Sequence, residues 1–235
     1  LPPAGKPADM NLEKAWLGRD DSALINIGEQ HRLLPAVAEA FNAMQQQARE
    51  AGQDMQIVSS YRNFDRQLSI WNRKWRGELP LYNHQGEQLD AASLADEEKV
   101  YAILIWSALP GGSRHHWGTD LDVYDKASVD ACGGQFDLVD AEYRPGGPCY
   151  ALAQWMDKHL ADFGFSRPFL QDNGGVATEL WHLTHRSSAA EFEARRNQQA
   201  LYECPSNAPM EGKSTVLAML DELFNRFVLN LGVQQ

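Results

Sequence analysis

Two short segments hold the residues of this chain that are best suited to chemistry. Residues 113–122 read SRHHWGTDLD, and residues 179–182 read ELWH. Together they offer imidazole nitrogens, carboxylate oxygens and a separate glutamate. This is the inventory of a hydrolytic zinc site, which needs three protein ligands, one open position and a base.

The spacing of these residues suggests a particular set of ligands. His115 and Asp122 are separated by a stretch that contains Gly118, and glycine permits backbone conformations that other residues resist. That arrangement fits a loop that turns back into a strand, so that both side chains reach one metal. His182 would add a third ligand from a separate strand, which leaves the fourth position to a water molecule.

Residue chemistry alone leaves the choice between neighbours open. His116 could replace His115 as a ligand. Asp120 could replace Asp122, because side chains two residues apart in a strand face the same side. The rival for the third ligand is His185.

Glu179 is the candidate base, because a carboxylate beside a metal can take a proton from water and return it to a leaving amine. In a regular strand, however, Glu179 and His182 would face opposite sides, so the backbone must turn between them. Considered without the neighbouring motif residues, Glu179 would be interpreted as a solvent-facing strand residue. Arg62, at a strand-to-helix junction, could bind a carboxylate or a developing oxyanion, or could equally form a surface salt bridge.

Hydrophobic periodicity predicts the elements that must position these residues. A helix is expected to start after a cap at Asn63 or Asp65. Strand-like alternation covers residues 55–62, 121–124 and 177–184. Residues 126–149 are expected to form a loop, and helical spacing covers residues 26–51, 96–109, 150–163, 188–203 and 213–231.

Composition is that of a soluble globular protein, with 43% hydrophobic and 23% charged residues in 235. A formal net charge of −11 argues against nucleic-acid binding, which needs a basic face. No apolar run approaches the roughly 20 residues that cross a bilayer. We expect an α+β fold in which helices pack on a small antiparallel sheet. The expected organisation is an extended lead-in at 1–25, the main domain at 26–190 and a helical extension at 191–235 packed on that domain.

The ends of the chain and its cysteines give further expectations. The chain begins with Leu1 and not with Met, which would fit a removed secretory signal. Of three cysteines, Cys132 and Cys149 flank a Gly-rich stretch and could form a disulfide in an oxidising compartment. Cys204 is expected to have no chemical role.

The order of the motifs resembles a known family. Ser-x-His-x-x-Gly-x-x-x-Asp followed by Glu-x-Trp-His resembles the VanY-type D-alanyl-D-alanine carboxypeptidases, which belong to a wider group with lysostaphin-type enzymes and hedgehog domains. Residues 59–62, SSYR, followed by Gln67, resemble an upstream segment of that family. The likeness covers roughly residues 55–186.

The resemblance implies a role for each residue of the motifs. It implies one zinc ion and a peptidoglycan stem peptide, or its precursors, as substrate. It also resolves the alternatives in favour of His115 and Asp122. The implied roles are zinc ligation by His115, Asp122 and His182, base catalysis by Glu179, stabilisation of the tetrahedral intermediate by Arg62, and substrate binding by Ser113, Gln67 and Tyr61.

The resemblance therefore implies a zinc-dependent D,D-carboxypeptidase in the bacterial cell envelope, periplasmic or secreted. An L,D-carboxypeptidase or an endopeptidase could use the same site. A non-catalytic zinc-containing cell-wall binding protein is the rival from another class, although such a protein would need neither Glu179 nor Arg62. Asp120 departs from the family, which often has a small residue such as Ala at this position.

Overall fold

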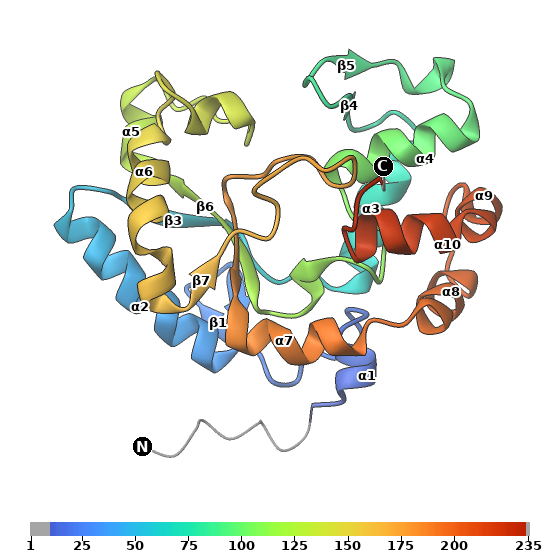
Figure 1. Ribbon diagram of the computed structural model, residues 1–235, viewed down its shortest axis with the longest axis horizontal. Helices are drawn as coiled ribbons and strands as arrows, with labels where there is room; N and C mark the ends of the chain where they lie inside the picture. The colour runs from blue at the N-terminus through green and yellow to red at the C-terminus, as the bar shows by residue number, and fades with distance from the viewer. Residues whose placement is uncertain (1–9, 234–235) are drawn as a thin grey trace.

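The computed structural model describes residues 10–233, and a four-stranded antiparallel sheet lies at its centre (Figure 1). This confirms the predicted α+β class. The part of the expected lead-in that covers residues 1–9 lies outside the described residues. In spatial order the strands are β3 (Met55–Ser59), β6 (Asp120–Asp125), β8 (His182–His185) and β7 (Phe165–Ser166).

The register of the sheet brings polar residues of neighbouring strands together. Asp122 of β6 pairs with His182 of β8 on one side and with Ser59 of β3 on the other. Asp120 pairs with Thr184 in the same way. Because side chains alternate along a strand, these residues share one face of the sheet. The intervening apolar side chains are fully buried on the other face: Leu121, Val123 and Leu183.

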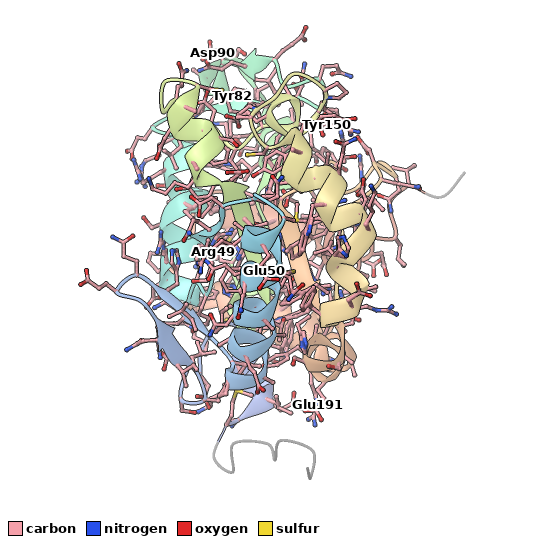
Figure 2. All side chains as sticks on the ribbon, turned by 90° about the vertical axis from the view of Figure 1, so that its left-hand side faces the viewer. Arg49, Glu50, Tyr82, Asp90, Tyr150 and Glu191 are labelled. Carbon is pink, nitrogen blue, oxygen red and sulfur yellow. The ribbon has the colours of Figure 1, made fainter. Side chains whose placement is uncertain are left out.

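One face of the sheet is covered by two helices that run side by side in both views (Figures 1 and 2). Figure 2 looks onto this side, with Arg49 and Glu50 at the C-terminal end of α2 and Tyr150 at the start of α6. The helical segment that begins at Tyr150 ends at Gly164, whose positive φ of 80° closes it. The elements are α2 (Pro35–Glu50), α6 (Tyr150–His159) and the short 3₁₀ helix η4 (Leu160–Phe163).

A second group of helices lies on the other side of the sheet, to the right in Figure 1. Asn63 caps the first of them by accepting a hydrogen bond from the backbone N–H of Arg66, as the sequence predicts. The elements are α3 (Phe64–Trp75), α4 (Asp96–Trp106), the hairpin β4 (Leu81–Tyr82) with β5 (Gln88–Leu89), and the 3₁₀ helix η1 (Ala91–Ser93).

The C-terminal region consists of short helices. Phe192, Leu201, Val216 and Leu223 belong to the same hydrophobic core as the sheet. The indole N–H of Trp71 donates to the carbonyl of Glu211, which ties this region to α3. The elements are α7 (Arg186–Arg195), α8 (Gln198–Ser206), α9 (Lys213–Ala218), α10 (Leu220–Leu223) and the π-helical η5 (Phe224–Val228).

The N-terminal region differs from the prediction in two places. The lead-in is not extended throughout, because Asn11 caps a short helix, α1 (Leu12–Ala15), and Trp16 is buried in the core. The helix expected from residue 26 begins only at Pro35, which occupies its first position. The residues before it form a hairpin, β1 (Ile25–Ile27) with β2 (His31–Leu33).

The region 126–149 is not simply a loop. It contains α5 (Lys126–Ala131) and the 3₁₀ helix η3 (Asp140–Tyr143). Both are held because Tyr143 and Cys149 are buried in a second small core together with Trp181. All three cysteines lie in the described part of the chain and are free, so Cys132 and Cys149 are not bridged in this structure.

Among residues 10–233, no helix combines the length and the apolar character needed to cross a membrane.

Candidate metal centre

The second motif forms a turn and not the expected strand. The strand predicted for residues 177–184 begins only at His182, and the N–H of His182 approaches the carbonyl of Glu179 at 3.4 Å. Upstream, the N–H of Glu179 donates to the carbonyl of Phe169. The turn solves the problem that regular alternation posed, because it places Glu179 and His182 on the same side.

His115 is held by its backbone and by one ring nitrogen. It lies in the 3₁₀ helix η2 (Arg114–His116), whose cap Ser113 accepts a hydrogen bond from the His115 N–H at 3.1 Å. Its Nδ1 lies 2.8 Å from the carbonyl oxygen of Ser60. Since a carbonyl can only accept, Nδ1 carries the proton and Nε2 keeps its lone pair. That Nε2 lies 3.4 Å from Oδ2 of Asp122.

Gly118 allows the loop between the two ligands to turn. Its φ is +71°, and a Cβ at this position would collide with the Leu24 side chain. The carbonyl of Gly118 accepts a hydrogen bond from the N–H of Leu34, which fixes the turn against the start of α2. The backbone therefore returns into β6 and brings Asp122 towards His115.

The ring of His182 contacts three carboxylates. Nδ1 lies 3.4 Å from Oδ1 of Asp122 and 3.4 Å from Oε2 of Glu179. Nε2 lies 2.7 Å from Oδ2 of Asp120 on the opposite side of the ring. Burial opposes a charge here, but the hydrogen bonds to Asp120 and Glu179 outweigh it and raise the pKa of His182 to about 9.

His115, Asp122 and His182 could hold one metal ion. Each offers a ligand atom, all three residues are buried, and the ligand atoms lie within 4.8 Å of one another. Among the described residues, the buried Oδ1 of Asp122 has no hydrogen-bond partner. A buried acceptor without a donor is costly, and a cation would satisfy it. The nearby carboxylates that favour a proton on His182 would also favour a cation. Two imidazoles and one carboxylate suit zinc.

The rival histidines have other partners. The Nδ1 of His116 lies 2.7 Å from the carbonyl of Arg62, and its Nε2 accepts from the N–H of Gly111. Both ring nitrogens are therefore engaged, and burial lowers the pKa of His116 to about 3. His185 lies on the other face of β8, where its ring packs edge-on against Phe165. Neither histidine is free to join His182.

Asp120 differs from Asp122 in how its oxygens are used. Its Oδ2 accepts from Arg114 Nε at 2.8 Å as well as from His182, and its Oδ1 accepts from the hydroxyls of Thr119 and Thr184. The side chain is completely buried, and these donors hold its pKa below the usual range against the effect of burial. Asp120 therefore orients the His182 ring and has no oxygen left for a metal.

Arg62 approaches the site from the end of β3. One guanidinium nitrogen, Nη1, donates to the hydroxyl of Ser59 at 3.1 Å. Its buried Nε has no acceptor among the described residues. Burial lowers the pKa of Arg62, while the negative charges of Asp122 and Glu179 oppose that shift. The guanidinium therefore interacts electrostatically with two residues of the site. A donor without a partner beside the ligands suits a group that stabilises an oxyanion.

The three predicted substrate residues occupy different places. Ser113 is buried and caps η2, directly beside His115. Gln67 is buried on α3, where its amide donates to the carbonyl of Ala108 and its Oε1 has no partner among the described residues. Tyr61 faces the β1–β2 hairpin, with Arg32 Cζ 5.6 Å from its ring centroid. Among the described residues, no hydrogen bond, ion pair or ring contact joins Tyr61 to the candidate ligands, so its role in substrate binding stays a prediction.

Sequence reasoning missed two residues near the site. Phe169 packs edge-on against the His182 ring, with centroids 4.9 Å apart. Lys74, on α3, is half-buried, and the charges that act on its ammonium are those of Glu179 and Arg62. A lysine seven residues after Gln67 lies on the same helix face, and this spacing could have identified it.

Comparison with known proteins identifies the family. The family model for VanY, D-alanyl-D-alanine carboxypeptidase, matches residues 30–188. This chain belongs to the VanY family. The match confirms the resemblance of the motifs and extends it beyond them at both ends.

Individual proteins that resemble this VanY family member share between 19% and 40% sequence identity with it. An uncharacterised protein of Haemophilus influenzae is 40% identical over 96 residues, which are 39% of this chain and 66% of that protein. A D-alanyl-D-alanine carboxypeptidase of Enterococcus faecalis is 26% identical over 157 residues, 66% of this chain and 47% of its own length. The chain thus spans about two thirds and about half of these relatives. A solved vancomycin-resistance D,D-pentapeptidase VanY with Zn(II) is 19% identical, with a TM-score of 0.49 over 72% of this chain and 83% of that one.

Proposed function

We propose that this chain is a zinc-dependent D,D-carboxypeptidase that hydrolyses the terminal D-Ala-D-Ala bond of peptidoglycan stem peptides. The observation that carries the proposal is the placement of Glu179 and Asp122 at 3.4 Å from the same nitrogen of His182, in a member of the VanY family. The relative from Enterococcus faecalis bears the name of this activity. Because such peptides lie in the bacterial cell envelope, we also propose a periplasmic or secreted location.

The proposed mechanism assigns a task to each side chain. Zinc held by His115, Asp122 and His182 would lower the pKa of water and polarise the peptide carbonyl. Glu179 would take one proton from the attacking water and deliver it to the amine of the departing D-alanine. Water thereby adds its hydroxyl to the carbonyl carbon while the C–N bond breaks.

Arg62 and the residues around the ligands would support this reaction. The guanidinium of Arg62, held through Nη1 by Ser59, would donate to the carbonyl oxygen as negative charge develops on it. Asp120 would keep the His182 ring in the orientation that presents Nδ1. The buried position of all three candidate ligands strengthens these interactions by excluding water.

Digestion of defined muropeptides tests the proposal. The zinc-loaded chain is incubated with pentapeptide and tetrapeptide stems, and the products are identified by mass spectrometry. Release of D-alanine from the pentapeptide alone supports the proposal. A tripeptide product would indicate an L,D-carboxypeptidase, an internal cut an endopeptidase, and unchanged peptides a binding protein. Metal analysis that finds no transition metal after zinc loading would count against the site itself.

A further inference from the structure

Arg114 joins the candidate metal centre to the helix α7. Its Nε donates to Oδ2 of Asp120 at 2.8 Å, and its Nη2 donates to Oε1 of Glu193 at 3.0 Å. The same oxygen of Asp120 lies 2.7 Å from Nε2 of His182. A continuous chain of contacts therefore runs from a candidate zinc ligand, through one carboxylate and one guanidinium, to a glutamate of α7.

The guanidinium of Arg114 fixes both oxygens of the Asp120 carboxylate. Oδ2 accepts directly from Nε of Arg114. Oδ1 accepts from the hydroxyl of Thr184 at 2.8 Å, and that hydroxyl accepts in turn from Nη2 of Arg114 at 2.8 Å. A hydroxyl can donate one hydrogen bond while it accepts another, so these contacts close a ring. The carboxylate is thereby held in one orientation towards His182.

Burial and packing keep Arg114 in this position. The side chain of Asp120 is completely buried, and that of Arg114 is only 11% exposed. Cζ of Arg114 lies 4.6 Å from the centroid of the Trp117 ring. That ring stacks on Phe192 of α7, with centroids 5.7 Å apart. The helix therefore contacts Arg114 directly through Glu193 and indirectly through Trp117.

Docking of α7 alone explains this network poorly. Glu193 is 41% exposed, and an ion pair with so exposed a partner adds little to stability. Phe192 already fixes the helix in the hydrophobic core. The buried part of the network is directed at His182, and the partner behind a ligating histidine sets the orientation of its ring. Arg114 also supplies the positive charge that a completely buried carboxylate needs.

We propose that Arg114 is a positioning residue of the metal centre, which fixes the Asp120 carboxylate against His182 and is itself anchored to α7 by Glu193. The inference rests on the zinc site of the proposed function and deepens it. Arg114 acts through Asp120 and does not itself bind the metal. Glu193 lies beyond residues 30–188, which match the family model, so the affinity for zinc depends on a contact from outside the matched region.

A double-mutant cycle on zinc affinity tests this role. A chromophoric chelator competes for zinc with Arg114→Met, with Asp120→Ala and with the protein that carries both changes. We expect Arg114→Met alone to lower zinc affinity about tenfold, the lower end of what loss of a partner behind a ligand costs. In the Asp120→Ala protein the same change should alter affinity by less than about twofold, because no carboxylate is left to position. Arg144→Met, at an exposed arginine, is the matched control.

Two further measurements separate positioning from stability. The visible spectrum of the cobalt-substituted protein reports the geometry of the ligands, and Arg114→Met should change it while Arg144→Met should not. Glu193→Ala, at a partly exposed side chain, should lower zinc affinity by more than about twofold, the limit of additivity for independent sites. This effect should also vanish with Asp120→Ala. The Glu193→Ala protein keeps the test available if Arg114→Met does not fold.

The outcomes separate the two proposals. Unchanged zinc affinity or an unchanged cobalt spectrum in folded Arg114→Met would overturn the role of Arg114 and leave the proposed function standing. An equal loss of affinity with and without Asp120 would also overturn it, because Arg114 would then not act through that carboxylate. Unchanged affinity in Glu193→Ala would overturn the anchoring by α7, and the whole inference where Arg114→Met does not fold. If the unaltered protein binds no zinc, the proposed function fails and the role of Arg114 fails with it.

Discussion

Asp120 and His182 lie on neighbouring strands, with Oδ2 of the aspartate 2.7 Å from Nε2 of the histidine. Asp122 lies at the other ring nitrogen, Nδ1. Asp120 therefore orients the His182 ring through Nε2, and Asp122, two residues later in the same strand, lies at the ring nitrogen that faces the candidate metal position. Asp120 differs from the residue that the family often has at this position, and the structure gives it a role: it fixes the ring of the candidate ligand His182.

Replacing Asp120 should weaken metal binding. Asp120→Asn removes the charge that fixes the His182 ring, and loss of such a partner typically lowers metal affinity about 10–100-fold. Competition between the protein and a chromophoric chelator for zinc measures this change. Asp130→Asn, at an exposed aspartate, is the control. Because Arg114 also loses the charge of one of its two carboxylate partners, the variant must first be shown to be folded; unchanged zinc affinity would contradict the orienting role.

The two adjacent histidines should respond differently to substitution. His115→Gln should abolish zinc binding, because it removes one of three ligands. His116→Gln should retain zinc but lower the free energy of unfolding by about 1–3 kcal/mol, since the buried N–H of Gly111 loses its acceptor. Metal analysis and urea denaturation distinguish the two effects. Retention of zinc by His115→Gln and its loss from His116→Gln would reverse the assignment.

Glu179→Gln should stop turnover without releasing the metal. The amide cannot accept the proton of the attacking water, and such acid–base catalysis contributes about 10²–10⁴ in rate. D-Alanine release and zinc content are measured on the same preparation. Glu98→Gln, at an exposed glutamate in the first turn of α4, is the matched control. Loss of zinc from Glu179→Gln would instead identify the residue as a ligand.

Arg62→Lys should lower the turnover number more than it raises KM. A lysine lacks the fork of donors, and removal of one oxyanion donor typically costs about 10²–10³ in kcat. Steady-state kinetics on a stem peptide measure both constants. Arg73→Lys, on the exposed surface of α3, should have no effect on either. A change in KM alone would mean that Arg62 binds the substrate equally before and during the reaction.

Lys74 should reduce stability below about pH 8. Burial holds the folded-state pKa of Lys74 at about 8, below the ordinary 10.5, so at neutral pH the folded protein buries a charge that the unfolded chain leaves in water. Lys74→Met should therefore raise the free energy of unfolding at pH 7 by about 1–3 kcal/mol. Between about pH 8 and 10.5 this advantage should shrink, because the unfolded chain then binds more protons than the folded protein. Urea denaturation of the zinc-loaded proteins across this range checks the trend; a difference that does not vary with pH would contradict it.

Part of the fold could be predicted because it depends on local sequence. The cap at Asn63, the helix stop at Gly164 and the turn at Gly118 each follow from the conformational preference of one residue. The region 126–149 could not be predicted in this way. Its short helices exist because Tyr143 and Cys149 find a buried partner in Trp181, which is distant in the sequence.

The sequence by itself determined the family and the identity of the groups able to do chemistry, because motif order and residue type are properties of the chain. Residue chemistry and spacing left open which neighbour takes which role, and the contacts that set these roles are found only in the tertiary structure. The pairing of β6 with β8 placed Asp122 and Asp120 at opposite nitrogens of His182, and the contacts of His116 with Gly111 and Arg62 removed it from the ligands. Such choices depend on hydrogen bonds between residues far apart in the chain, which spacing along the sequence does not encode.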